Sequence, residues 1–181
     1  MSKVFWDPEF TPSYTPMEMI KLGVFEGIYT AAIPGVPKKY TDHKNVLPRG
    51  SDPDITINHY GVKSRQSLKE WQRKKWTTKL SPLGWWQWYI LYYGGRRNEK
   101  EDALQIARWK SFVARHNAQV QAKCKPGDKT CNTKQRQGIL QWAWNSDTAF
   151  TDTQRSKNLK RLRKQPEVSL EALTELAYLD W

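Results

Sequence analysis

Hydrophobic side chains recur with helical spacing after residue 98. Five of them fall within about 80° of arc at about 100° per residue, which predicts one buried helix face. This stripe is Ile106, Trp109, Val113, His116 and Val120, and Arg108, Arg115 and Gln119 occupy the opposite side. Asn98 and Glu101 have the spacing of a capping box, so we expect the helix to begin there.

A second segment, residues 85–93, is aromatic or aliphatic at almost every position. Because it has no polar face, we expect a helix in the centre of the core, with Trp85, Trp86, Trp88 and also Trp109 buried. Ser81 as N-cap and Pro82 at the first helical position would begin it. Gly94 and Gly95 would end it.

Cap signals predict further helices at about residues 15–23 and 67–76. Helical spacing of side chains predicts two more, at about residues 135–144 and 167–181. Thr15 followed by Pro16 begins the first of these four, and Gly23 ends it. Ser67 and Glu70 form a capping box for the second.

The first 60 residues hold seven of the ten prolines, which favours a loop-rich lobe. Within it, residues 25–30 alternate well enough to predict one strand. We therefore expect a mainly α, single-domain protein. Its expected parts are a Pro-rich N-terminal lobe (1–60), a helical core (61–145), a basic linker (146–166) and a C-terminal helix (167–181).

The charge is concentrated in the middle of the chain. The net charge is +12, and residues 61–165 carry 24 basic side chains against 7 acidic ones. Such a segment favours a polyanionic partner, and nucleic acid is the commonest one. We expect DNA in preference to RNA.

No apolar run is long enough to span a membrane, and the N-terminus lacks a signal-peptide pattern. We therefore expect a cytoplasmic protein, in an infected cell or a virion if the source is a phage. Cys124 and Cys131 could pair, but the sequence does not require it. With His116 they do not match the ligand spacing of structural zinc, so no metal or cofactor is expected.

Several tryptophans lie beside basic residues, a pattern typical of proteins that stack nucleobases and neutralise phosphates. Trp71, Trp76 and Trp142 are the candidates for base stacking. The candidates for phosphate contacts are Arg96, Arg97, Arg108 and Arg115, with Lys160, Arg161 and Arg163 adding affinity. Gly94 to Arg97 lie just before a helix start. Two glycines, two arginines and the free N–H groups of the helix start together predict an anion-binding site.

An enzyme that excises or modifies bases is the first alternative, with a flipped base held in an aromatic pocket. The chain has no Walker, G-x-S-x-G or H-E-x-x-H motif. A general acid or base would come from the N-terminal lobe, where the candidates are Glu26, Asp42, Asp52, Asp54, His43 and His59.

Several motifs together resemble a Trp-rich family of phages, large DNA viruses and microbial eukaryotes that has no assigned activity. They are Leu22 to Tyr29, Pro82 to Tyr89, Gly95-Arg96-Arg97, Gln105 to Trp109, Pro126-Gly127-Asp128, Arg136-Gln137 and Leu140 to Ala143. The resemblance covers roughly residues 15–145 and favours work on nucleic acid. A second alternative is a structural or interaction protein, such as a phage particle component whose aromatic surface is a subunit interface.

Overall fold

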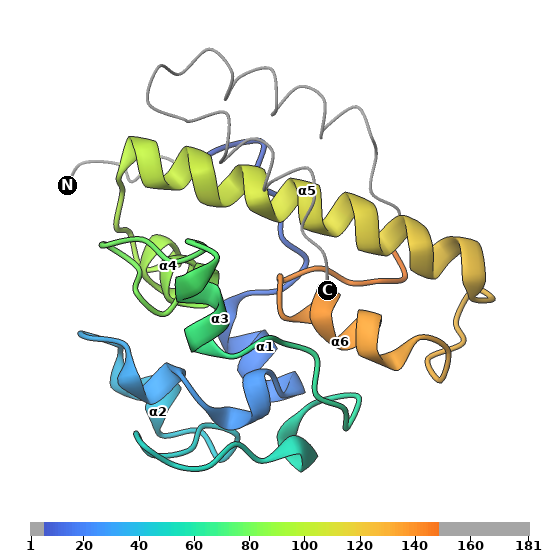
Figure 1. Ribbon diagram of the computed structural model, residues 1–181, viewed down its shortest axis with the longest axis horizontal. Coiled ribbons are helices and arrows are strands. Elements are labelled where there is room, and N and C mark those ends of the chain that lie inside the picture. Colours follow the sequence, from blue (N-terminus) through green and yellow to red (C-terminus); the bar gives the residue numbers. More distant parts are fainter. Residues whose placement is uncertain (1–5, 149–181) are drawn as a thin grey trace.

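The computed structural model describes residues 6–148, and within this range every regular element is helical (Figure 1). The α-helices are α1 (Pro16–Leu22), α2 (Lys38–Thr41), α3 (Leu68–Arg73), α4 (Trp85–Tyr93), α5 (Glu99–Lys123) and α6 (Thr133–Leu140). Three 3-10 turns are η1 (Phe25–Gly27), η2 (Thr30–Ala32) and η3 (Ile55–Ile57). The prediction of a mainly α fold is confirmed. The helix expected at 167–181 and nearly all of the basic linker lie outside the described residues.

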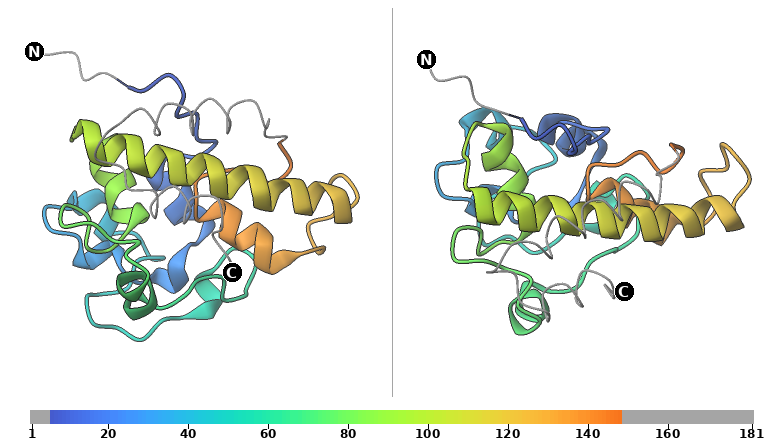
Figure 2. Two further views of the ribbon diagram at one scale, coloured as in Figure 1. Left: turned by 45° about the horizontal axis from the view of Figure 1, so that its top comes forward. Right: turned by 90° about the horizontal axis from the view of Figure 1, so that it is seen from above.

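Helix α5 runs along the long axis of the molecule, and α6 lies against its C-terminal half (Figures 1 and 2). The side chain of Asn98 accepts a hydrogen bond from the Glu101 N–H at 3.0 Å, so α5 begins where its capping pattern predicts. All five residues of the apolar stripe are buried. In the described residues no helix is both long and apolar enough to cross a membrane.

Helix α4 is the centre of the core, as predicted. Seven of its nine residues are buried, including Trp85, Trp86 and Trp88. The ring of Phe10 makes edge contacts with five aromatic rings, with centroid distances from 4.9 to 6.3 Å. Phe10, from a segment near the N-terminus, thereby packs between α4 and Trp109 of α5.

The start of α4 differs from the prediction. Gly84, with φ of +79°, is the N-cap, and the helix begins at Trp85, after the expected proline position. Ser81 does not cap α4, because its buried hydroxyl accepts a hydrogen bond from Arg96 at 2.8 Å. Helix α3 begins after the Ser67 cap, as predicted. It ends at Arg73, three residues before the predicted end at Trp76.

The strand expected at residues 25–30 is wrong. Phe25, Glu26 and Tyr29 have φ values of +52°, +53° and +76°, which no strand adopts. Side-chain amides satisfy this backbone in place of a neighbouring strand: the Phe25 N–H donates to Gln141 Oε1 and the Glu26 N–H to Asn58 Oδ1. Periodicity could not reveal these long-range partners. Helix α1 does form at Pro16, with a complete capping box from Thr15 and Glu18.

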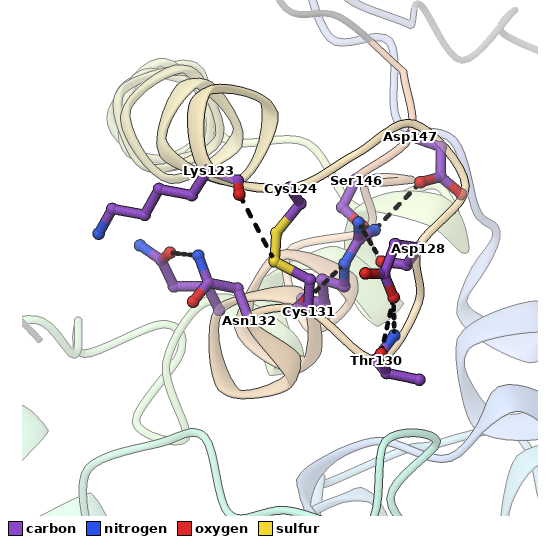
Figure 3. Close-up of a disulfide and its surroundings, with 10 residues drawn as sticks. Lys123, Cys124, Asp128, Thr130, Cys131, Asn132, Ser146 and Asp147 are labelled. Atoms are coloured by element: carbon purple, nitrogen blue, oxygen red, sulfur yellow. Dashed lines mark hydrogen bonds and ion pairs between the residues drawn. A yellow bond between two sulfur atoms is a disulfide. The ribbon is translucent and has the colours of Figure 1, made fainter.

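Cys124 and Cys131 form a disulfide that ties the end of α5 to the segment before α6 (Figure 3). The buried guanidinium of Arg136 holds the intervening loop through the carbonyls of Asp128 and Cys131. It also donates to Ser146 and pairs with Asp147 at 3.0 Å. One arginine therefore joins the disulfide loop to the chain that follows α6.

Candidate functional site: an aromatic pocket

An aromatic pocket with a cavity volume of about 80 Å³ lies where α4 and α5 meet the segments around residues 25, 65, 71–76 and 142. Its aromatic lining is Phe25, Trp71, Trp76, Trp85, Trp86, Phe112 and Trp142. Its other lining residues are Ser64, Arg65, Gln66, Gly84, Gln105, Arg108 and Gln141. All three tryptophans predicted to stack on bases, which are far apart in the sequence, thus meet at one site.

The chain around Trp71 and Trp76 is held against α5 by Arg108. The guanidinium of Arg108 donates to the Trp76 carbonyl at 2.7 Å and to the Lys75 carbonyl at 3.3 Å. Lys75 has a φ of +56°, and the Trp76 N–H returns to the Trp71 carbonyl at 2.8 Å, so the two tryptophans belong to one tight turn. Arg108, which the sequence predicts to contact phosphates, is buried.

Gly84 lies against the Trp71 ring. Its φ of +79° disfavours any other residue, although a Cβ atom there would only make an ordinary van der Waals contact with the ring, at 3.4 Å. On the other wall, Trp142 packs 5.0 Å from Trp85 and stacks on Phe112 at 4.8 Å between ring centroids. Trp71, Trp76 and Trp142 are only partly buried, whereas Trp85 and Trp86 are core residues whose edges reach the pocket.

Gln105 and Gln141, two of the three glutamines that line the pocket, differ in their hydrogen bonding. Gln141 is fully engaged, because its Nε2 donates to the Ser64 carbonyl at 2.7 Å while its Oε1 accepts from the Phe25 N–H. Gln105 is 0% exposed, and neither its Oε1 nor its Nε2 has a hydrogen-bond partner within the described part of the chain. The Gln105 amide is therefore unsatisfied at both ends.

A buried ion pair lies behind the wall formed by Arg65. Arg65 Nε donates to Glu26 Oε2 at 2.5 Å, with both side chains less than a tenth exposed. Arg65 also donates to the Tyr29 hydroxyl at 3.0 Å, and burial raises the pKa of Tyr29 above its ordinary value. The positive φ values of Phe25, Glu26 and Tyr29 cluster here, and such strain is typical of functional sites.

The segment that carries Trp71 and Trp76 is basic. Residues 69–79 carry five basic side chains, Lys69, Arg73, Lys74, Lys75 and Lys79, and a single acidic one, Glu70. Glu70 pairs with Arg73 at 2.8 Å, while Lys69, Lys75 and Lys79 are exposed. The Lys74 Nζ lies 4.7 Å from the centroid of the Trp76 ring. Positive charge thus accompanies the two partly buried tryptophans of this segment.

The arginines predicted for phosphate contacts are largely engaged by the protein itself. Arg96 donates to the Leu80 carbonyl and to Ser81, and it pairs with Glu101 at 2.9 Å. Arg97 donates to the Tyr92 carbonyl and stacks on the Tyr92 ring at 3.7 Å. Arg115 is half-buried on α5 and does not line the pocket. Lys160, Arg161 and Arg163 lie outside the described residues.

The candidate acids and bases are dispersed. Asp42 pairs with Lys38 on the surface, Asp52 is exposed, and Asp54 caps η3 through the Thr56 N–H. His43 is half-buried away from the pocket, and the exposed His59 packs edge-on against Tyr60. Only Glu26 contacts a residue of the aromatic pocket, through its ion pair with Arg65.

No metal site is formed by the residues 6–148. Cys124 and Cys131 are joined in the disulfide, and His116 packs on Phe112 with ring centroids 4.2 Å apart. This range contains no cluster of three or more His, Cys, Asp or Glu side chains that could hold a metal ion.

Sequence reasoning missed Gln105, Phe25 and Arg65 as parts of the pocket. A signal existed for the first: Gln105, Arg108 and Phe112 are spaced i, i+3 and i+7, which places them on one face of α5. Comparison with family models, curated proteins and solved structures finds no match. The resemblance to a Trp-rich phage and viral family therefore stays a prediction.

Proposed function

We propose that this protein binds nucleic acid, DNA in preference to RNA, through the aromatic pocket and the basic residues that flank Trp71 and Trp76 in the sequence. One observation carries the proposal: Trp71, Trp76 and Trp142 converge on a single pocket. Stacking on aromatic rings requires bases whose faces are free, so the substrate is a single strand or an unstacked nucleotide within a duplex.

The phosphate contacts come from the exposed lysines of residues 69–79. Lys69, Lys75 and Lys79 are exposed and adjoin the two tryptophans of the turn. Arg96 takes no part in this account, because the Leu80 carbonyl, Ser81 and Glu101 occupy its guanidinium. Arg108 acts by holding the Trp76 turn in place.

Tryptophan fluorescence tests this function. Single-stranded and duplex oligodeoxynucleotides are titrated at two salt concentrations into the full chain, a Trp76→Leu variant and a Tyr93→Leu variant. Tyr93 is an exposed aromatic residue that does not line the pocket, so it serves as the matched control. We expect salt-sensitive quenching, stronger with the single strand, and weaker binding only in Trp76→Leu. Equal binding by both variants and the wild type would remove the pocket from the account.

A base-excising or base-modifying enzyme is the second candidate. The strained backbone at Phe25, Glu26 and Tyr29, together with the buried Glu26–Arg65 pair, favours it. Mass analysis of oligonucleotides incubated with the wild type and with Glu26→Gln tests it. The activity predicts a product that only the wild type forms, whereas unchanged oligonucleotides in both reactions argue for binding alone.

A further inference from the structure

Gln105 differs from the other buried glutamines of the described chain. Gln137 donates to the Gly23 carbonyl and accepts from the Tyr60 N–H, and Gln141 is similarly engaged. Gln87 accepts from the Leu83 N–H at 2.9 Å. Among these four, only Gln105 lacks a partner at both ends of its amide within residues 6–148, and like Gln141 it lines the aromatic pocket.

A buried amide without partners lowers the stability of the folded protein unless something satisfies it. Gln105 nevertheless stays at this position, because contacts on either side of it hold α5 in place. Its own carbonyl accepts from Trp85 Nε1 at 3.2 Å, and one turn later Arg108 anchors the Trp76 loop. Because Gln105 lines the pocket, a molecule bound there is placed to satisfy its amide.

The chemistry of that partner follows from the amide and the walls. A carboxamide presents one donor and one acceptor side by side in a plane, so its partner must present an acceptor and a donor in the same way. Indole walls favour a flat, aromatic partner. Each nucleobase has such a donor and acceptor pair on its Watson–Crick edge.

The charge around the pocket favours a phosphate-bearing ligand over a neutral one. Arg65 and Arg108 line the wall, where Glu26 pairs with the first and the Lys75 and Trp76 carbonyls bind the second. Exposed lysines of residues 69–79 flank Trp71 and Trp76 in the sequence. A neutral sugar also stacks on tryptophan but gains nothing from these lysines, whereas a nucleotide gains from both the stacking and the charge.

The geometry points to a base-reading site: the pocket holds one nucleobase between its tryptophans, and the Gln105 amide recognises the hydrogen-bonding edge of that base. This inference rests on the proposed function and adds to it the residue that determines specificity. The aromatic walls supply affinity for any base, and Gln105 supplies the discrimination between bases.

The test measures binding of the four deoxynucleoside monophosphates, of deoxyribose phosphate and of a difluorotoluene deoxynucleotide, which has the shape of thymidine without its hydrogen bonds. We expect the preferred nucleotide to bind about tenfold more weakly to Gln105→Leu than to the wild type. We expect the difluorotoluene nucleotide to bind Gln105→Leu at least as well as the wild type. Gln121→Leu, an exposed position on the same helix, should match the wild type.

A second variant guards against a folding defect in the first. Gln105→Glu replaces the donor with an acceptor, so the preference should move toward guanine, whose N1–H and N2–H are adjacent donors. Equal affinities for all four nucleotides in the wild type and both variants would overturn the inference, as would deoxyribose phosphate that binds as well as a nucleotide.

The same data separate this inference from the proposed function. Oligonucleotides that bind with salt-sensitive quenching but without any effect of Gln105 would leave nucleic-acid binding intact and reject base reading. Mononucleotides that depend on Gln105, with oligonucleotides that do not bind, would support the base site and reject nucleic-acid binding.

Discussion

Arg65 and Glu26 form a buried ion pair, with Nε and Oε2 2.5 Å apart, directly behind the aromatic pocket. Both side chains have left water, so each depends on the other for its charge to be tolerated. Because Arg65 also lines the pocket and contacts Tyr29, the pair fixes one wall of the candidate site.

Glu26→Gln should therefore lower the free energy of unfolding by about 3 kcal/mol or more, because it leaves the Arg65 charge buried without its counterion. The exposed pair Lys38–Asp42 is the matched control, and Asp42→Asn should cost less than about 1 kcal/mol. Urea denaturation of the two variants measures the difference. Similar losses in both would contradict the assignment of a buried pair.

Gln105→Leu should stabilise the free protein. The substitution removes an amide that has no partner within residues 6–148, so the free energy of unfolding should rise by about 1 kcal/mol. Gln141→Leu, which removes an amide that has partners, should instead lower it by about 2 kcal/mol. Thermal and urea unfolding of both variants give the sign of each change, and a destabilised Gln105→Leu would show that the amide is satisfied in solution.

The disulfide closes a short loop, and its loss should cost about 2.5 kcal/mol according to the loop-entropy relation. The double variant Cys124→Ser, Cys131→Ser should unfold at correspondingly lower urea concentration, and reductant should affect only the wild type. Disulfides are rare in the cytosol, where we expect this protein, so alkylation of the two thiols in intact cells also tests that location. Identical stability of the wild type with and without reductant would show that the bridge contributes nothing.

Alkaline pH should unfold the protein through its buried tyrosines. Burial raises the pKa values of Tyr29, Tyr40, Tyr89 and Tyr92 above the ordinary 10.0. Above pH 10 the unfolded chain loses these protons first, so the folded state holds more protons and stability falls as the pH rises. Below pH 10 these groups contribute no pH dependence. Tyrosinate absorbance should therefore appear together with the loss of helical circular dichroism, and ionisation of all tyrosines at pH 10 with the helices intact would contradict it.

Elements that depend on residues close together in the sequence were predictable, whereas those that depend on distant residues were not. The start of α5 at Asn98 and the burial of α4 rest on local caps and on composition, and both were predictable. The turn at Phe25 and Glu26 depends on Gln141 and Asn58, distant residues that no local pattern identifies. The sequence predicts base stacking by Trp71, Trp76 and Trp142. That the three residues meet in one pocket follows only from the tertiary structure.

Arginine is where the sequence was least informative. Adjacent arginines suggest anion binding, yet Arg96 satisfies carbonyl and hydroxyl groups at the start of α5 and Arg108 holds a loop. Charge patterning cannot distinguish a guanidinium that faces solvent from one that satisfies buried acceptors. The exposed lysines near Trp76 are better candidates for phosphate contacts.

The salt dependence of single-strand binding tests nucleic-acid recognition most directly. For the wild type, a plot of the logarithm of the binding constant against the logarithm of salt concentration should fall with a slope of about 0.7 per phosphate neutralised. Lys75→Ala should make the slope shallower by about one phosphate, whereas Lys125→Ala, an exposed lysine in the disulfide loop, should leave it unchanged. A flat plot for the wild type, or no binding at low salt, would contradict nucleic-acid recognition at this pocket.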